Sequence, residues 1–547
     1  MNGTGQASAD LERVTGELRD EWGVAAARIR PVVLGLAGER WWTLGELVRE
    51  HGVSRRSVEA AVRRLGPWLE ERGSRMRVAA QHRDAVAAAW PASAPAPAAA
   101  DLERAMAELM RGLPPSDRDL DHVPATPATA GRRARFLAES FDLAGASVLC
   151  LGDHDLTSLA LAQVQPDADI AVVDVDEAVL EHVGRAAGER GWPVRPLYAD
   201  LRVDLPPSVR EGCDVVFVDP PYTAAGVHLF LVRALAALRQ RDASRVVFCY
   251  GYGEGHPALG LKVQAEYHGL HLVAEAIVPG FNRYAGAEAL GAASALYVCR
   301  PTRRTWAALA HARPVDPRIY SQGDRAETAA LEPLPAAIAE AALGAAGERP
   351  LLVGDGWPAE LAPDAERLPL ARYLADVRAG SARPPFTGPV HAGAVAVNLR
   401  PHLAGYLPRL LLTAASRRLV AAAPAGSVGE LTGGRLAELV GVRYRVEHAG
   451  ALVVADRLDE EPAGPAARAL RRLLDRPAAT LGSAWREALI AVAAEEGRQL
   501  TKNGARAAIA GTATGRLYAR CHVSELPLDR LRELPADVAR SLSASLN

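Results

Sequence analysis

Short apolar runs alternate with amphipathic helical stretches between residues 147 and 300. These runs are SVLCLGD, AVVDVD, VVFVDPP, RVVFCYG, HLVAEAIV and ALYVCR. The first four are rich in valine and end in Asp or Gly, which is typical of parallel strands that are buried on both faces. With the intervening helices they predict βαβ units in a doubly wound α/β sheet, whose ligand binds at the carboxyl ends of the strands.

A helical pattern followed by a hairpin pattern occupies the N-terminal part of the chain. RIRPVVLGLAG reads as a helix, Thr43 and Glu46 form a capping box for TLGELVREHG, and Ser54 caps SRRSVEAAVRRL. PWLEERG and RMRVAA then alternate as the strands of a hairpin do. This order predicts a winged helix-turn-helix domain at residues 1–89, and the Pro/Ala run at 90–100 predicts a linker.

The second helix of that predicted domain is rich in arginine and could lie in a DNA major groove. The arginines concerned are Arg55, Arg56, Arg63 and Arg64. However, only Lys262 and Lys502 are lysines among the 63 Lys+Arg residues, so runs of arginine carry little information about function in this chain. The net charge of −2 also excludes a generally basic surface. We therefore favour a solvated face on a docking domain, with nucleic acid as the less favoured partner.

A weaker repeat of the apolar pattern at residues 147–300 begins near residue 350. LLVGDG resembles VLCLGD, AVAVNLRPHLAGYLPRLLL resembles VVFVDPPYTAAGVHLFLV, and RRLVAAAP resembles SRVVFCYG, in the same order. Asn398 stands near where Asp219 would be and Pro-Pro-Tyr is missing, so we expect a structural or dimerisation role for this region. The predicted parts after the linker are a catalytic domain at 101–305, a degenerate α/β domain at 306–475 and a mostly helical segment at 476–547.

Composition narrows the class of protein. The chain has 547 residues, 49% hydrophobic and 23% charged, as expected for a folded protein of several domains. None of its five cysteines forms a CxxC pair, which argues against a zinc ribbon or a disulfide scaffold. No apolar signal region and no uncharged run long enough to span a bilayer is present. We therefore expect a cytoplasmic protein that needs no metal and no membrane, and we expect a homodimer.

Acidic residues end four consecutive predicted strands. They are Asp153 and Asp155 after Gly152, then Asp174 and Asp176, then Asp200, and finally Asp219. An acid at the end of the second strand can accept both hydroxyls of a ribose, and either Asp174 or Asp176 fits this role. Asp200, after the third strand, can accept from an adenine amine. Each acid alone could simply cap a helix, but the four in order predict a site for an adenosyl nucleoside.

The first and fourth strand ends also indicate a reaction. An ordinary S-adenosylmethionine site has a glycine-rich first loop, whereas here Asp153 and Asp155 lie where the carboxylate of that ligand would approach. Like charges there cost free energy, so the loop favours decarboxylated S-adenosylmethionine, and hence aminopropyl transfer over methyl transfer. At the fourth end, Asp219-Pro220-Pro221-Tyr222 places an acceptor beside an aromatic face, which can hold an amine by hydrogen bonding and cation–π contact.

Four segments resemble one family. GDHDLTSLALA, VVDVDE, FVDPPYT and NRYAGAEALGAASALYVCRPT are similar to the branched-chain polyamine synthases, or N4-bis(aminopropyl)spermidine synthases, over about residues 101–305. The resemblance implies transfer of a 3-aminopropyl group from decarboxylated S-adenosylmethionine to the secondary amine of spermidine, with release of methylthioadenosine. Two departures are present: His154 replaces the middle Asp of the family's Gly-Asp-Asp-Asp loop, and the run after Phe230 lacks the family's serine.

We expect the residues of this predicted site to have different catalytic and binding roles. We expect Asp155 and Asp219 to orient the amine and accept its proton, Asp153 to hold the ammonium of the aminopropyl donor, and Tyr222 to form a wall of the pocket. His154 is either a base with a pKa near neutrality or a loop residue facing solvent. The expected nucleoside-binding residues are Gly152, Asp153, Asp174, Asp176, Asp200 and Pro220.

Two other classes of function compete with this hypothesis. One is an S-adenosylmethionine-dependent N-methyltransferase, since Asp-Pro-Pro-Tyr also serves methylation of exocyclic amines after base flipping. The missing glycines of the first loop argue against it. The other is a winged-helix regulator whose α/β domain senses a nucleoside or a polyamine.

Overall fold

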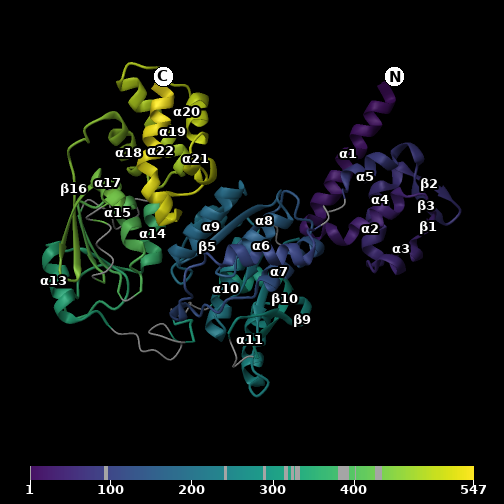
Figure 1. Cartoon of the computed structure of the whole chain (residues 1–547), viewed down its shortest axis with the longest axis horizontal. Helices are drawn as coiled ribbons and strands as arrows, with labels where there is room; N and C mark the ends of the chain where they lie inside the picture. Colours follow the sequence, from purple (N-terminus) through teal and green to yellow (C-terminus); the bar gives the residue numbers. More distant parts are fainter. Residues whose placement is uncertain are drawn as a thin grey trace. The chain divides into compact units, whose positions relative to one another are not determined.

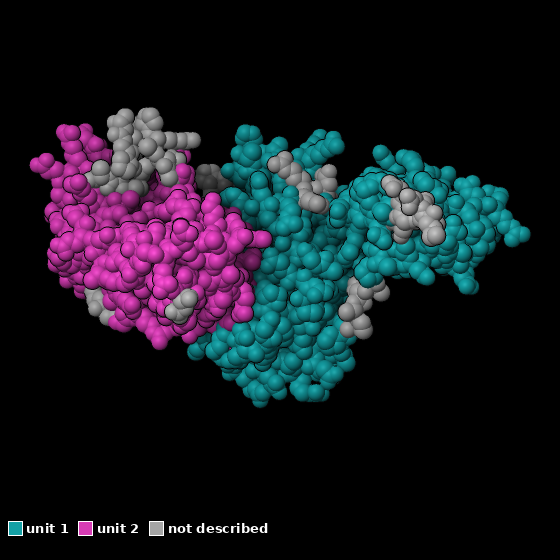
Figure 2. All heavy atoms as spheres, turned by 90° about the horizontal axis from the view of Figure 1, so that it is seen from above, with its two compact units in different colours: residues 1–172, 185–194, 209–322 teal, residues 173–184, 195–208, 323–547 magenta. Residues whose placement is uncertain are grey.

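The computed structural model divides the chain into two compact units. Unit 1 comprises residues 1–172, 185–194 and 209–322, and unit 2 comprises residues 173–184, 195–208 and 323–547 (Figure 2). The described residues are 2–91, 96–239, 243–286, 291–312, 318–321, 326, 333–379, 393–400, 402–424, 431 and 434–546. Parts of the predicted linker and of the NRYAGAEALGAASALYVCRPT segment lie outside these residues.

The N-terminal part of unit 1 consists of helices and a small sheet. In chain order these elements are α1 (Asn2–Trp22), α2 (Ala26–Ala37), β1 (Trp42–Thr43), α3 (Leu44–His51), α4 (Arg55–Leu65), β2 (Leu69–Arg72), β3 (Arg75–Val78) and α5 (Arg83–Ala89). The capping box is present, because the Thr43 side chain accepts from Glu46 N–H and the Glu46 carboxylate accepts from Thr43 N–H. Ser54 Oγ accepts from Ser57 N–H at the start of α4.

Ion pairs occupy several of the arginines in this part. Arg55 pairs with Glu59 at 2.8 Å, and Arg64 pairs with Glu21 at 2.9 Å. The buried Asp142 carboxylate binds Arg19 of α1 at 2.6 Å and Arg30 of α2 at 2.8 Å. The Asp142 N–H also donates to the Val24 carbonyl at 2.9 Å. These contacts tie α1 and α2 to the chain just before the central sheet.

The central sheet has seven strands in the order β6-β5-β4-β7-β8-β10-β9. The strands are β4 (Ser147–Leu151), β5 (Asp169–Asp174), β6 (Val194–Tyr198), β7 (Val215–Val218), β8 (Arg245–Tyr250), β9 (Val273–Arg283) and β10 (Ala293–Arg300). β7 is parallel to β4 and β8, and β10 is antiparallel to β8 and β9. Every residue of β7 and β8 is buried. The prediction of a Rossmann-like, S-adenosylmethionine-type sheet is therefore confirmed.

Helices precede, connect and follow the strands of the central sheet (Figure 1). They are α6 (Ala99–Met110), α7 (Pro127–Ser140), α8 (Thr157–Val164), α9 (Glu177–Arg190), α10 (Ala224–Ala237), α11 (Pro257–Gly269) and α12 (Arg303–Ala310). α6 packs on α7, α7 on α8, and α10 on α11 and β7. The cysteines are all buried thiols, as expected of small apolar side chains.

Unit 2 contains a second sheet in the order β12-β11-β13-β14-β16-β15. Its strands are β11 (Leu351–Val353), β12 (Arg367–Leu368), β13 (Ala394–Asn398), β14 (Arg418–Ala422), β15 (Tyr444–Ala449) and β16 (Leu452–Arg457). The helices around and after it are α13 (Ala336–Ala346), α14 (Leu370–Ala379), α15 (Tyr406–Thr413), α17 (Gly434–Gly441), α18 (Pro465–Leu474), α19 (Leu481–Glu495), α20 (Lys502–Ala510), α21 (Ala513–Tyr518) and α22 (Leu528–Leu546). None of the helices in the described ranges combines the length and apolar character that a bilayer crossing requires.

Candidate active site: an acid cluster around a buried arginine

Arg133 lies at the centre of the acid cluster, although no motif in the sequence marks it as a site residue. It comes from α7, which begins at Pro127 after Thr126 caps the helix by accepting from Thr129 N–H. Arg133 shares the buried face of α7 with Ala130, Ala134 and Leu137, and its own side chain is completely buried. A buried guanidinium is stable only when paired, so its partners define the site.

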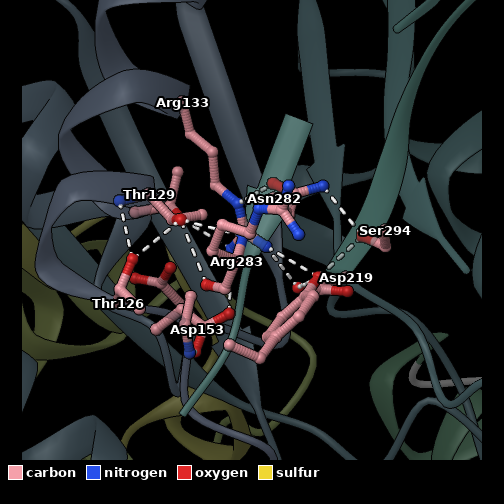
Figure 3. Close-up of polar contacts among 12 residues, drawn as sticks. Thr126, Thr129, Arg133, Asp153, Asp219, Asn282, Arg283 and Ser294 are labelled. Atoms are coloured by element: carbon pink, nitrogen blue, oxygen red, sulfur yellow. Dashed lines mark hydrogen bonds and ion pairs between the residues drawn. The ribbon is translucent and has the colours of Figure 1, made fainter. Parts of the chain in front are cut away.

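The guanidinium joins residues from three elements far apart in sequence. Arg133 Nη1 donates to Asp155 Oδ2 at 2.8 Å, and Nη2 donates to Asp219 Oδ2 at 2.6 Å. Nε donates to Asn282 Oδ1 at 2.8 Å, and Nη2 also lies 3.1 Å from the Tyr284 hydroxyl. Figure 3 shows Arg133, Asp219 and Asn282 converging in this way. Two carboxylates share one cation, so the cluster carries a net negative charge when both are ionised.

Asp219 is the titratable member of the cluster. Its Oδ1 accepts from the Tyr222 hydroxyl at 3.3 Å and its Oδ2 from the Tyr284 hydroxyl at 3.0 Å. Burial raises the pKa of Asp219 to about 6, with a further contribution from the charge of Asp155, while Arg133 and Tyr284 oppose the rise. The carboxyl group can therefore gain or lose a proton close to neutral pH.

Asp155 is more completely engaged than Asp219. Its Oδ1 accepts from Ala125 N–H at 2.6 Å, and its Oδ2 holds Arg133. Its side chain is 9% exposed, against 15% for Asp219. The residue after it, Leu156, is buried with a φ of 55°, a left-handed conformation that a branched side chain adopts only at a cost. This backbone conformation accompanies the contact between the Asp155 carboxylate and the Arg133 guanidinium.

Asp153, two residues earlier, faces the start of α8. Its carboxylate accepts from Ser158 N–H at 3.2 Å and from the Ser158 hydroxyl. The N-terminus of a helix favours a negative charge at this position. Gly152 before it has a φ of 71°, which glycine adopts without strain. The loop therefore fixes the buried Asp153 carboxyl group at the start of α8.

His154 is buried and does not face solvent, so that alternative is wrong. Its Nε2 lies 3.1 Å from Ser116 Oγ, and its ring stacks on His122 with centroids 4.3 Å apart. The stacking partner precedes α7 in the chain, and the sequence pattern gave no sign of it. His154 is thus a packed member of the loop.

Two tyrosine hydroxyls contact the Asp219 carboxyl group. The Tyr222 and Tyr284 hydroxyls are 2.7 Å apart, and the Tyr222 ring is tilted against Tyr250 at 5.4 Å. Burial holds the pKa values of Tyr222 and Tyr284 well above the usual range, so both phenols stay protonated and donate to the carboxylate. Pro220 and Pro221 fix this turn. Asn282 lies on β9 and Tyr284 follows the end of that strand, two residues after Asn282, which places both on one face, a periodicity visible in NRY.

The acids of unit 2 have different surroundings. Asp174, buried at the end of β5, accepts from Asp176 N–H at 2.9 Å. Asp176 accepts from Ala178 N–H at 2.9 Å and from Val179 N–H at 3.3 Å, so it caps α9. The Asp200 carboxylate accepts from Arg202 N–H at 3.0 Å and pairs with the Arg202 guanidinium. Asp174 and Asp176, either of which fitted the ribose-binding role by sequence, therefore differ in their hydrogen bonding.

Comparisons with known proteins place one segment in a family. Residues 101–320 match the branched-chain polyamine synthase A C-terminal domain. An uncharacterized protein of Methanocaldococcus jannaschii is 34% identical over 174 residues, which cover 31% of this chain and 43% of that protein. The N(4)-bis(aminopropyl)spermidine synthase of Thermococcus kodakarensis is 33% identical over 133 residues, which cover 24% of this chain and 38% of that enzyme. The chain thus spans less than half the length of these relatives.

The chain is also similar to a solved structure. The branched-chain polyamine synthase from Thermus thermophilus, in complex with N4-aminopropylspermidine and 5'-methylthioadenosine, is 22% identical. The similarity covers 58% of this chain and 98% of that chain, with a TM-score of 0.34. The resemblance inferred from the sequence motifs is confirmed by the family match over residues 101–320.

Proposed function

We propose that this protein transfers a 3-aminopropyl group from decarboxylated S-adenosylmethionine to an amine of a polyamine such as spermidine, and releases methylthioadenosine. The observation that carries the proposal is Asp219, an acid with a pKa of about 6 beside tyrosine rings. Such a carboxylate attracts a polycation and can take up one proton from it. The family match of residues 101–320 and the names of the relatives support the same reaction.

The reaction is a single displacement at carbon. The acceptor nitrogen uses its lone pair to attack the carbon beside the sulfonium, the carbon–sulfur bond breaks, and its electron pair stays on sulfur as the neutral thioether. The nitrogen loses one proton, which Asp219 accepts. Because the sulfonium is already a good leaving group, most of the acceleration comes from aligning nitrogen, carbon and sulfur.

Asp219 is better suited than Asp155 to accept that proton. Both oxygens of Asp155 are engaged, by Ala125 N–H and by Arg133, whereas Asp219 Oδ1 accepts only the long 3.3 Å bond from Tyr222 among the hydrogen bonds of the described residues. We therefore assign proton acceptance to Asp219 and the orientation of Arg133 to Asp155. Asp153 would hold the ammonium of the aminopropyl donor, and Tyr222 would pack on the acceptor amine.

The test of this function is a comparison of two ligands. Calorimetry should show tighter binding of decarboxylated S-adenosylmethionine than of S-adenosylmethionine, because a carboxylate approaching Asp153 and Asp155 is repelled. Mass spectrometry of reactions with a panel of polyamines should then show products heavier by one aminopropyl group or more. Tighter binding of the carboxylated form together with methylated products would contradict the proposal and favour the N-methyltransferase.

Asp174, and not Asp176, should accept the ribose hydroxyls. Asp174→Asn keeps an acceptor for Asp176 N–H but removes the charge, so we expect methylthioadenosine to bind about tenfold more weakly or worse. Asp176→Ala removes the cap of α9 and should lower the free energy of unfolding by about 1 kcal/mol with little change in binding. Calorimetry measures methylthioadenosine binding by both variants, and thermal denaturation measures their stability. A larger loss of binding in Asp176→Ala would reverse the assignment.

The sheet of unit 2 supports the proposal of a degenerate repeat. Its order, β12-β11-β13-β14-β16-β15, is that of β5-β4-β7-β8-β10-β9 in the central sheet, without a counterpart of β6. At the position equivalent to Asp219, Asn398 Nδ2 donates to the Asp355 carbonyl at 2.7 Å, and a Cβ on Gly354 would lie 2.6 Å from the Asn398 carbonyl oxygen. The ends of β11 and β13 therefore lie too close together to leave room for a ligand like that of the central sheet, so we assign this repeat a structural role. The N-terminal part, with arginines paired to glutamates, serves in this proposal as a winged-helix docking domain.

A further inference from the structure

Unit 2 includes two short segments of the central sheet in addition to residues 323–547, which we call the C-terminal half of the chain. These are residues 173–184, after β5, and residues 195–208, along and after β6. They carry Asp174, Asp176 and Asp200, the acids expected to bind the nucleoside. Side chains of the C-terminal half that contact these segments therefore act on the nucleoside-binding turns.

Arg409, on α15, makes the most extensive of these contacts. Its side chain is completely buried, and its Nη2 donates to Glu177 Oε1 at 2.6 Å and to the Leu526 carbonyl at 2.7 Å. Its guanidinium carbon lies 3.5 Å from the centre of the Tyr198 ring. Glu177 directly follows Asp176, and Tyr198 is the last residue of β6. One buried cation thus links the turn after β5 to the end of β6.

Glu177 is held from a second direction. Its Oε2 accepts from Leu528 N–H at 2.8 Å, at the start of α22. Burial raises the pKa of Glu177, and the charge of Arg409 counteracts this. The first residue of α9 is therefore fixed by both α15 and α22.

Tyr406, three residues before Arg409, holds the other turn. The Asp200 N–H donates to its hydroxyl at 3.1 Å, and its ring packs edge-on against Tyr198 with centroids 5.6 Å apart. The approach is so close that a Cβ on Gly405 would lie 2.1 Å from the Tyr198 hydroxyl oxygen, so only glycine is tolerated there. The start of α15 thus meets the backbone from which Asp200 projects.

Contacts further along strengthen the attachment of the segment after β6. Arg378 pairs with Asp204 at 2.9 Å, and the buried Glu525 carboxylate accepts from the Ser208 hydroxyl and N–H. Burial raises the pKa of Glu525 to about 7, and the hydrogen bonds from Ser208 oppose this rise. The C-terminal half therefore holds residues 195–208 at both ends.

We infer that Arg409 and Tyr406 are positioning residues for the aminopropyl donor: they hold the turns that carry Asp174 and Asp200 in the geometry that binds its nucleoside. This inference rests on the proposed function. A turn that must be ordered at the moment of binding costs conformational entropy, whereas a turn fixed in advance does not. The C-terminal half thus acts in recognition of the nucleoside although neither residue touches the reacting atoms.

The test uses the full-length chain with Arg409→Met and Tyr406→Phe. Arg409→Met removes the charge that joins both turns, and we expect the Kd of methylthioadenosine and the KM of the aminopropyl donor to rise by about tenfold or more. Tyr406→Phe removes one hydrogen bond and should raise both by about threefold. The polyamine KM, and kcat at saturating aminopropyl donor, should stay close to those of the unsubstituted protein.

Arg443→Met provides the matched control. Arg443 is also a buried arginine of unit 2, but it donates to the Ala414 carbonyl and pairs with Asp475. Its substitution should lower the thermal unfolding temperature without a selective loss of nucleoside binding. Equal nucleoside binding by all variants, or a polyamine KM that rises as much as that of the aminopropyl donor, would overturn the inference.

The outcomes also separate this inference from the proposed function. If the unsubstituted protein binds no methylthioadenosine, the proposed function fails and the inference fails with it. If that protein binds the nucleoside and both Arg409→Met and Tyr406→Phe bind it equally, only the inference fails. If Arg409→Met does not fold, Tyr406→Phe decides, because it removes a single oxygen atom.

Discussion

Asp219→Asn lowers kcat for aminopropyl transfer by about 10²- to 10⁴-fold and leaves methylthioadenosine binding intact, because an amide can still accept a hydrogen bond but cannot take up the proton. Steady-state kinetics and calorimetry measure the two effects. The matched control is Asp169→Asn, at the exposed start of β5, where the same substitution should change neither. Near-normal turnover in Asp219→Asn would rule out proton acceptance by this residue.

The pH dependence provides a second measurement on the same residue. With a pKa of about 6, Asp219 is protonated and unable to accept a proton at lower pH, so kcat/KM should fall as the pH drops through about 6. The Tyr284 hydroxyl stabilises the ionised form by donating to it. Tyr284→Phe should therefore raise the pKa of Asp219 and move this acidic limb to higher pH. An unchanged limb would mean that another group titrates.

Arg133→Met should destabilise the protein by about 3–5 kcal/mol, because it leaves two buried carboxylates without their cation. Urea unfolding followed by circular dichroism measures the loss. The matched control is Arg132→Met, which changes the exposed neighbour in the chain and should alter the free energy of unfolding by no more than about 0.5 kcal/mol.

The loss in Arg133→Met should also depend on pH. Without the cation, the folded-state pKa of Asp219 lies further above its unfolded value, so the folded state favours the protonated acid. The difference in stability between Arg133→Met and the unsubstituted protein should therefore be smallest near pH 4 and grow as the pH rises towards 7. A loss that is constant over this range would show that Arg133 does not control the ionisation of Asp219.

The strand ends of the site could be predicted from the sequence, whereas the residue that joins them could not. Asp153, Asp155 and Asp219 follow Val-rich runs, and parallel strands bring their carboxyl ends to one edge of a sheet. Arg133 gives no such sign, because arginine is common in this chain and the burial of its side chain depends on how α7 packs. Its partner Asn282 is 149 positions away, on a strand that runs antiparallel to β10.

Local hydrogen bonds and packing distinguish residues that their spacing in the sequence could not distinguish. Asp174 and Asp176 are both acids at the end of a strand, but only the backbone conformation after β5 shows that Asp176 caps α9. Similarly, His154 is buried because His122 comes from a distant loop to stack on it. The capping box of Thr43 and Glu46, by contrast, depends on neighbours in sequence and was predicted correctly.

The hydrogen bond from Leu528 to Glu177 has a consequence for biosynthesis. It spans 351 positions, and the bonds from Ser208 to Glu525 span 317. A growing chain on the ribosome can form the Arg133 cluster once β9 has emerged, but the turns that carry Asp174 and Asp200 lack these contacts until the last helix has been made. Contacts of such long range form late. Under the proposed function, the capacity to bind the nucleoside therefore matures only after α22 has been translated.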